Sequence, residues 1–133
     1  MDHKINLIFL IDDDKSINYY HALIIEKSKL KMETMAFTDA REALNLIENA
    51  RDDVDIPDLI LLDLNMPRFD GWDFIEGFKK ISHKLPKNIQ IYIISNFLSD
   101  NDRLRAQDEE IVNGICYKPV SQYDFLEIAN NYS

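Results

Sequence analysis

Short runs of apolar residues, each about the length of a β-strand, recur along this chain of 133 residues. Four of them stand out: Ile5–Ile11, Leu59–Leu62, Ile89–Ile94 and Ile115–Tyr117. Runs that are apolar at nearly every position are typical of strands buried on both faces, as in a parallel sheet that helices cover. A fifth run, Met32–Phe37, mixes polar and apolar residues, so we expect it to form an edge strand.

The intervals between these runs carry the three- and four-residue spacing of amphipathic helices. Asp39 precedes one of them as a candidate N-cap, with Glu42 three residues later in the arrangement of a capping box. The helical segments that we expect are marked by Ile17, Tyr20, Ile24 and Ser28; by Ala40, Ala43, Leu44 and Ile47; by Trp72, Ile75 and Phe78; by caps within residues 99–102, running to about Val112; and by Tyr123, Leu126 and Ala129 or Asn130. Five strand-then-helix units predict an α/β fold, a five-stranded parallel sheet with helices on both faces.

Polar side chains follow four of the predicted strands at the point where each strand ends. Asp12, Asp13 and Asp14 follow the first run; Asp63, Ser95 and Lys118 follow the other three. Each one alone is explained by a chain leaving a strand. Because the carboxyl ends of parallel strands meet at one edge of a sheet, where ligands bind, we expect these side chains to lie together.

The charges of this predicted cluster favour a divalent cation. Asp12, Asp13 and Asp63 contribute −3 and Lys118 contributes +1, which leaves −2, and carboxylates that repel one another tend to bind protons or a cation. Mg²⁺ prefers oxygen ligands of this kind and usually keeps several waters. A serine hydroxyl such as that of Ser95 and an ammonium group suit phosphoryl oxygens, and an aspartate can be a nucleophile towards phosphorus.

Composition excludes several other classes of protein. Asp and Glu total 24 against 15 Lys and Arg, and the net charge of −9 argues against binding to a nucleic-acid backbone or an anionic membrane. The single cysteine, Cys116, cannot form an internal disulfide and fits a reducing compartment. The apolar stretch Leu7–Ile11 is too short to span a bilayer and lacks the features of a signal peptide. We therefore expect a cytoplasmic protein.

The order and spacing of these residues resemble the receiver domain of two-component response regulators over nearly the whole chain. The matching segments are Leu10–Asp14, Pro57–Pro67, Phe69–Gly71 and the Lys118-Pro119 pair, of which the stretch from Pro57 to Gly71 is the most specific. The resemblance implies a flavodoxin-like (βα)5 fold with the parallel strand order 2-1-3-4-5. We expect residues 1–133 to form a single receiver domain without an output domain.

The resemblance also implies a role for each residue of the cluster. Asp63 would accept the phosphoryl group, Ser95 would be the switch hydroxyl, and Lys118 would contact the phosphoryl group. Asp13 and Asp63 would bind Mg²⁺ directly, Asp12 would bind it through a water, and the backbone carbonyl of Asn65 would complete the protein ligands. A cis peptide bond is expected between Lys118 and Pro119.

Several positions depart from the common pattern of the family. Ser95 stands where threonine is more frequent, and Asn96 stands where a small residue is usual, so that it could narrow access to Asp63. Phe97 occupies a position that often tunes hydrolysis, and we predict slow loss of the phosphoryl group through shielding. Ile115 replaces the usual rotating aromatic residue, and whether Tyr117 substitutes for it stays open.

The expected protein is a signalling module and not a metabolic enzyme, because it would catalyse only its own phosphorylation and dephosphorylation. Its partners would be a sensor histidine kinase or a histidine phosphotransfer protein and an unspecified downstream protein. A contact surface and a solvated face are equally consistent with the residues that the family pattern places near the fourth and fifth helices: Arg103, Arg105, Tyr117, Gln122 and Tyr123. The charges of Asp108 and Glu109 favour a monomer or weak dimer.

Two alternative functions remain at this point. A degenerate receiver could act as an unphosphorylated scaffold, although Asp13, Asp63 and Lys118 are all present. A small aspartate-nucleophile phosphatase would carry a second aspartate two residues after the first, where this chain has Asn65. The histidines lack metal-ligand spacing, and we expect His21 to lie on a helix surface or to be half-buried.

Overall fold

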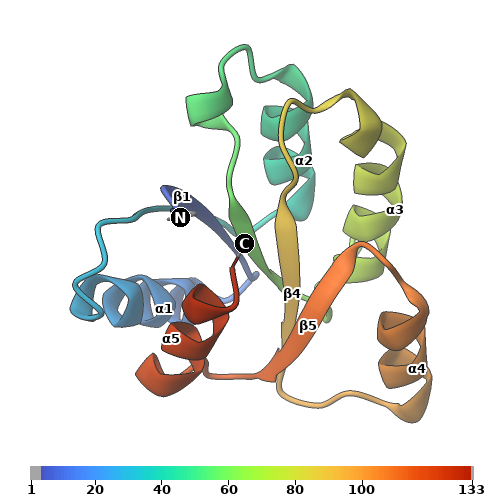
Figure 1. The fold of residues 1–133 in the computed structure, drawn as a ribbon. Coiled ribbons are helices and arrows are strands. Elements are labelled where there is room, and N and C mark those ends of the chain that lie inside the picture. Colours follow the sequence, from blue (N-terminus) through green and yellow to red (C-terminus); the bar gives the residue numbers. More distant parts are fainter. Residues whose placement is uncertain (1–3, 133) are drawn as a thin grey trace.

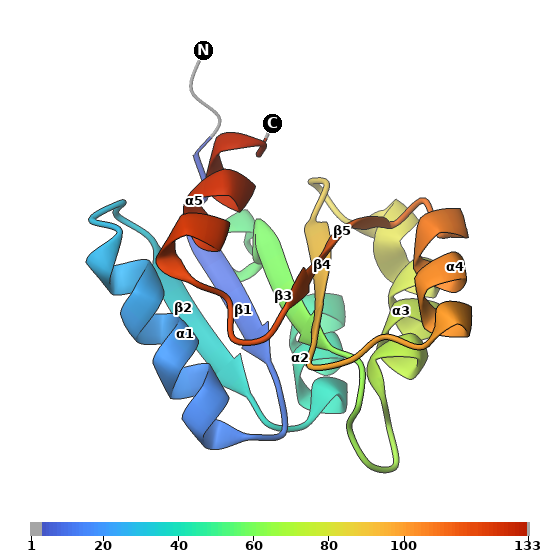
Figure 2. The ribbon, with the colours of Figure 1, turned by 90° about the horizontal axis from the view of Figure 1, so that it is seen from below.

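A computed structural model describes residues 4–132 and contains one five-stranded parallel sheet. The strands are β1 (Leu7–Ile11), β2 (Glu33–Phe37), β3 (Leu59–Asp63), β4 (Gln90–Ser95) and β5 (Val112–Tyr117). Their order in the sheet is β2-β1-β3-β4-β5. Figure 1 shows the whole fold, and Figure 2 shows β2 at one edge of the sheet. This order and the edge position of β2 confirm the flavodoxin-like fold predicted from the sequence.

Helices cover both faces of the sheet. They are α1 (Lys15–Lys27), α2 (Ala40–Asn49), α3 (Gly71–Ile81), α4 (Asp100–Asp108) and α5 (Gln122–Asn130), with short 3₁₀ turns at Asp53–Asp55 and Ser82–Lys84. The helices α1 and α5 lie side by side on one face, and α2, α3 and α4 lie on the other (Figures 1 and 2). Within residues 4–132, no helix is long and apolar enough to cross a bilayer.

Alternation along the central strands divides the core into two apolar layers. In β3, Leu59 and Leu61 pack towards α1 and α5, whereas Ile60 and Leu62 pack towards α2 and α3. All five residues of β3 are buried, which is the pattern that its unbroken apolar run predicts. The strand therefore carries its last residue, Asp63, to the sheet edge in a rigid setting.

Side-chain caps fix where the helices begin. Asp14 caps α1, Asp39 caps α2, and Ser121 caps α5. The predicted cap at Asp39 is confirmed, but its carboxylate accepts from the N–H of Arg41, and reciprocal capping boxes occur instead at Asp70 with Asp73 and at Ser121 with Asp124.

The expected buried face of α1 is confirmed at Ile24 but is wrong at Tyr20. Asn18, His21, Ile24 and Ile25 are the buried residues of this helix, and Tyr20 is exposed. Hydropathy did not mark this face because two of its four residues are polar and are buried through hydrogen bonds. His21 is 1% exposed, so the expectation of a surface or half-buried histidine is also wrong.

The last two helices also differ from the expectations. The helix α4 ends at Asp108, before β5 begins at Val112, because β5 extends further towards the N-terminus than its apolar run. In α5, Phe125 and Ile128 are buried, while Tyr123 is 70% exposed. The aromatic ring of Tyr123 therefore belongs to the outer surface rather than to the core.

Polar contacts join α4 to α3. The Trp72 indole N–H donates to Oδ1 of Asp102 over 3.0 Å, and the Arg105 guanidinium lies 4.3 Å from the centre of the indole ring. Arg105 also pairs with Glu76 at 3.4 Å, and Lys79 of α3 pairs with Glu109 just after α4 at 3.0 Å. Ala106 is the one residue of α4 that is buried, so ion pairs and hydrogen bonds supply much of the attachment of α4 to α3.

Candidate metal and phosphoryl site

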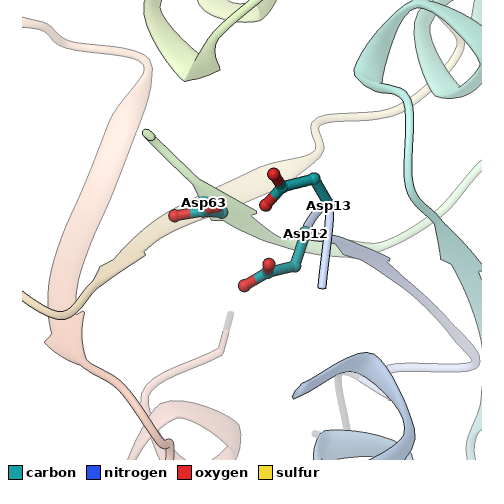
Figure 3. A group of neighbouring side chains, drawn as sticks. All are labelled: Asp12, Asp13 and Asp63. Carbon is teal, nitrogen blue, oxygen red and sulfur yellow. The ribbon is translucent and has the colours of Figure 1, made fainter. Parts of the chain in front are cut away.

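Three carboxylates meet at the carboxyl edge of the sheet. Asp12 follows β1 directly, Asp13 comes next, and Asp63 is the last residue of β3. One carboxylate oxygen from each residue lies within 4.8 Å of the others, and the three side chains gather at this edge (Figure 3). Asp12 and Asp63 are buried whereas Asp13 is exposed, so the cluster is closed on the side of the sheet and open to solvent above it.

Backbone hydrogen bonds hold Asp12 and Asp63 in place. Oδ1 of Asp12 accepts from the N–H of Asp14, and the Asp12 N–H donates to the carbonyl of Phe37 at the end of β2. Oδ1 of Asp63 accepts from the N–H of Asn65 over 3.3 Å. The chain must turn sharply after β3, and Gly71 fits there because a Cβ atom at this position would stand 2.7 Å from the Asp63 carbonyl oxygen.

One lysine serves two of the carboxylates. Nζ of Lys118 lies 2.9 Å from Oδ2 of Asp12 and 3.3 Å from Oδ1 of Asp63, and the side chain is only 8% exposed. The backbone of Lys118 is fixed by its N–H, which donates to the carbonyl of Ser95. With Asp13 included, the formal charge of this group is −3 + 1 = −2, as expected from the sequence.

Burial and the shortage of positive charge both affect the pKa values of this group. Burial and then the charge of Asp12 raise the pKa of Asp63 to about 6, against the opposing effect of Lys118. Burial and the charge of Asp12 also raise the pKa of Asp13. The pKa of Lys118 is raised in spite of burial, through its hydrogen bonds and charge interactions with Asp12 and Asp63.

The donor set fits Mg²⁺. Carboxylate oxygens are the hard ligands that this ion prefers, and a +2 charge would bring the formal charge of the cluster to zero. The open side above Asp13 leaves space for the waters that Mg²⁺ usually retains. Asp12, Asp13 and Asp63 are thus the side chains that could hold the ion.

Ser95 lies at this edge but its hydroxyl is engaged with the following loop. Oγ donates to the carbonyl of Phe97 over 2.8 Å and accepts from the N–H of Phe97 and from Nδ2 of Asn65. The side chains of Asn96 and Phe97 are exposed, and at 73% exposure Phe97 covers little of the site. The exposed side chain of Phe97 therefore does not support the expectation that it shields the site.

The two candidate switch residues of β5 lie in different surroundings. Ile115 is partly buried against the apolar layer of α2 and α3. Tyr117 is exposed, and its hydroxyl accepts a hydrogen bond from Nη1 of Arg103 over 3.1 Å. Arg103, Arg105, Gln122 and Tyr123 are exposed as well, so the surface predicted near α4 and α5 does face solvent.

The peptide bond between Lys118 and Pro119 is cis, as the family resemblance implied. Sequence reasoning missed Asn18 and His21, whose side chains bind the backbone beside the site: Asn18 donates to the carbonyls of Asp12 and Phe37, and His21 accepts from the N–H of Val120. Their three-residue spacing beside Ile24 and Ile25 was the available signal, because it places all four on one side of the helix.

Comparison with known proteins agrees with this architecture. The sequence profile of the response regulator receiver domain matches residues 8–130. The probable methanogenesis regulatory protein FilR2 of Methanothrix harundinacea is 28% identical over 126 residues, which cover 89% of this chain and 75% of that protein. The sensor histidine kinase CheAY of Helicobacter pylori is 30% identical over 114 residues, or 86% of this chain, but the match spans only 13% of the kinase.

Solved structures give the same result. A two-component response regulator from Cytophaga hutchinsonii superposes with a TM-score of 0.83 at 26% identity, covering 98% of both chains. A response regulator receiver protein from Dyadobacter fermentans, at 23% identity, has a TM-score of 0.82 over 95% of this chain and 96% of its own, which shows the shared fold.

Proposed function

Because the chain belongs to the response regulator receiver domain family, we propose that it accepts a phosphoryl group on Asp63 in the presence of Mg²⁺. The donor is a phosphohistidine on a sensor histidine kinase or a histidine phosphotransfer protein. The observation that carries this proposal is the buried Asp63 carboxylate, which shares one lysine with Asp12 inside a cluster of three carboxylates. Such a cluster is costly for a fold and is useful when a cation and a phosphoryl group bind there.

The transfer uses few groups. A carboxylate oxygen of Asp63 attacks phosphorus and the phosphorus–nitrogen bond of the donor breaks, leaving the electron pair on the imidazole nitrogen, which takes up a proton. Asp13, Asp63, the backbone carbonyl of Asn65 and, through a water, Asp12 would hold Mg²⁺, and the ion when bound would neutralise charge on the phosphoryl oxygens. Lys118 needs only to exchange an Asp63 oxygen for a phosphoryl oxygen, because its Nζ already lies 3.3 Å from Asp63.

We further propose that Ser95 reports the modification. Its hydroxyl must leave the carbonyl of Phe97 to donate to a phosphoryl oxygen, which changes the loop between β4 and α4. The exposed residues of α4, β5 and α5 then form the contact surface for a downstream protein, with Tyr117 held by Arg103 in the unmodified state. The chain would act in the cytoplasm as a monomer or weak dimer, and its single cysteine supports that compartment.

The test is the mass of the intact protein after incubation with Mg²⁺ and acetyl phosphate. We expect one phosphoryl adduct on the wild type and none on Asp63→Asn or on wild type with a chelator. Asp58→Asn is the matched control, because it changes the buried aspartate that directly precedes the same strand. A folded wild type that takes no adduct from acetyl phosphate or from a phosphohistidine donor would favour an unphosphorylated scaffold.

A further inference from the structure

The buried imidazole of His21 contacts the segment that carries Lys118, although His21 itself lies on α1. Its Nε2 accepts a hydrogen bond from the backbone N–H of Val120 over 3.0 Å. Because Nε2 accepts, the neutral ring carries its proton on Nδ1. Burial lowers the pKa of His21 to about 4, so the acceptor is retained at neutral pH.

Two backbone hydrogen bonds enclose Lys118. On one side, its own N–H donates to the carbonyl of Ser95 over 2.9 Å. On the other side, Pro119 has no N–H, so Val120 carries the next donor along the chain. That donor is the one bound by His21, and the backbone of Lys118 is therefore fixed from β4 and from α1.

The same face of α1 is tied to Asp12. Nδ2 of Asn18 donates to the carbonyl of Asp12 over 3.0 Å and to that of Phe37 over 3.2 Å. One helix face thus holds the backbone of Asp12 and the segment just after Lys118. The Nζ atom of Lys118 lies 2.9 Å from Oδ2 of Asp12. The relative position of this ammonium and carboxylate depends on α1 as well as on the sheet.

We propose that His21 is a positioning residue for phosphoryl transfer, which holds Lys118 against Asp12 and Asp63 through the N–H of Val120; this inference rests on the proposed function. Packing alone would not require an acceptor here, because the neighbouring core is built from apolar residues such as Ile24, Ile25 and Phe125. An apolar side chain would leave a buried N–H without a partner, and the segment would shift to satisfy it.

The experiment compares His21→Leu, which removes the acceptor, with His21→Gln, whose Oε1 can take the place of Nε2. The rate of phosphorylation by acetyl phosphate is measured at saturating Mg²⁺, together with the affinity for Mg²⁺ and amide exchange at Lys118 and Val120. We expect the leucine variant to react about 10-fold more slowly, with faster exchange at both amides and unchanged Mg²⁺ affinity. The glutamine variant should stay within about twofold of the wild type.

Phe125→Leu is the control for lost stability, because it loosens the same core without removing the acceptor. If His21→Leu does not fold, His21→Asn replaces it, since the shorter amide cannot reach Val120. Equal rates for wild type and the acceptor-free variant would overturn the inference. So would a slowing of the glutamine and Phe125 variants that equals the slowing of the acceptor-free variant. If the wild type itself takes no adduct, the proposed function fails. Faster amide exchange at Lys118 in the leucine variant, but not in the glutamine variant, would still support the role of His21 in positioning Lys118.

Discussion

A buried aspartate lies beside a lysine at each end of β3, Asp58 directly before the strand and Asp63 as its last residue, but the two negative charges are balanced differently. At the start of the strand, Oδ2 of Asp58 accepts from the N–H groups of Asn6 and Leu7 at 2.8 and 3.1 Å, and Oδ1 binds Nζ of Lys87 at 3.0 Å. At the end of the strand, Asp63 shares Lys118 with Asp12. Asp58 therefore has a lysine of its own to balance its negative charge, whereas Asp63 has only a share of one.

This difference separates a structural carboxylate from one that is available for chemistry. The hydrogen bonds of Asp58 join the start of β1 to β3, and groups of the fold itself balance its negative charge. The charge of Asp63 is only partly balanced, which suits the proposed binding of a cation, and burial followed by the charge of Asp12 raises its pKa to about 6.

The largest effect is expected from Lys118→Met, for which Lys87→Met is the matched control. Lys118→Met should slow phosphorylation by acetyl phosphate about 100-fold, because a charge at the developing phosphoryl oxygens is lost. Lys87→Met should leave the rate within about twofold, since Lys87 binds Asp58 at the far end of the strand. Time courses of the intact mass measure both rates, and a comparable slowing in the two variants would remove the distinction between the ends.

Asp58→Asn should destabilise the protein by about 2.5 kcal/mol at pH 7, because charge-assisted hydrogen bonds to two backbone N–H groups and to Lys87 are weakened. Urea unfolding followed by circular dichroism gives the free energy of unfolding. Glu76→Gln is the control, since its surface ion pairs are exposed and worth little. A loss no greater than that of the control would show that Asp58 is dispensable for the fold.

Asp63→Asn should have the opposite sign and stabilise the Mg²⁺-free protein by about 2 kcal/mol at pH 7. The folded-state pKa of about 6 exceeds the usual 3.8, so the folded protein binds the proton more tightly than the unfolded chain does. The stability of the wild type relative to the variant should therefore fall as the pH rises from 4 to 6 and level off above that. Urea titrations across this pH range would refute the argument if the difference were independent of pH.

The smallest effect is the protection that Mg²⁺ gives. At a free concentration ten times its Kd, the ion should raise the free energy of unfolding by about 1.4 kcal/mol, because it binds the folded state alone. Asp13→Asn should abolish most of this gain, whereas Asp55→Asn, in the 3₁₀ turn before β3, should keep it. Stabilisation of both variants to the same extent would place the ion elsewhere.

The fold and most of the site geometry could be predicted from the sequence because they rest on strong local patterns. Strands buried on both faces show as unbroken apolar runs, and the parallel arrangement then brings the residues after them to one edge. Asp12, Asp13 and Asp63 do cluster there, and Lys118 reaches two of them. The tie between the Ser95 hydroxyl and the Phe97 carbonyl could not be predicted, because it depends on the path of one loop.

The polar residues of the buried face of α1 were missed for a related reason. Asn18 and His21 are polar, and a hydropathy pattern cannot show that backbone groups of Asp12, Phe37 and Val120 bind Nδ2 of Asn18 and Nε2 of His21. Asp58 was overlooked as well, since its partners Asn6, Leu7 and Lys87 lie far from it in the sequence. Contacts of this kind are set by the tertiary fold.

The contact between Trp72 and α4 gives the molecule an internal optical sensor. Trp72 is the sole tryptophan of the chain, its indole N–H is bound to Asp102, and Arg105 lies over its ring. Indole emission depends on such hydrogen bonds and nearby charges, so any displacement of α4 from α3 would change the spectrum without an added label. A stopped-flow trace could then time the motion of this helix against the chemistry at Asp63 in a single cuvette.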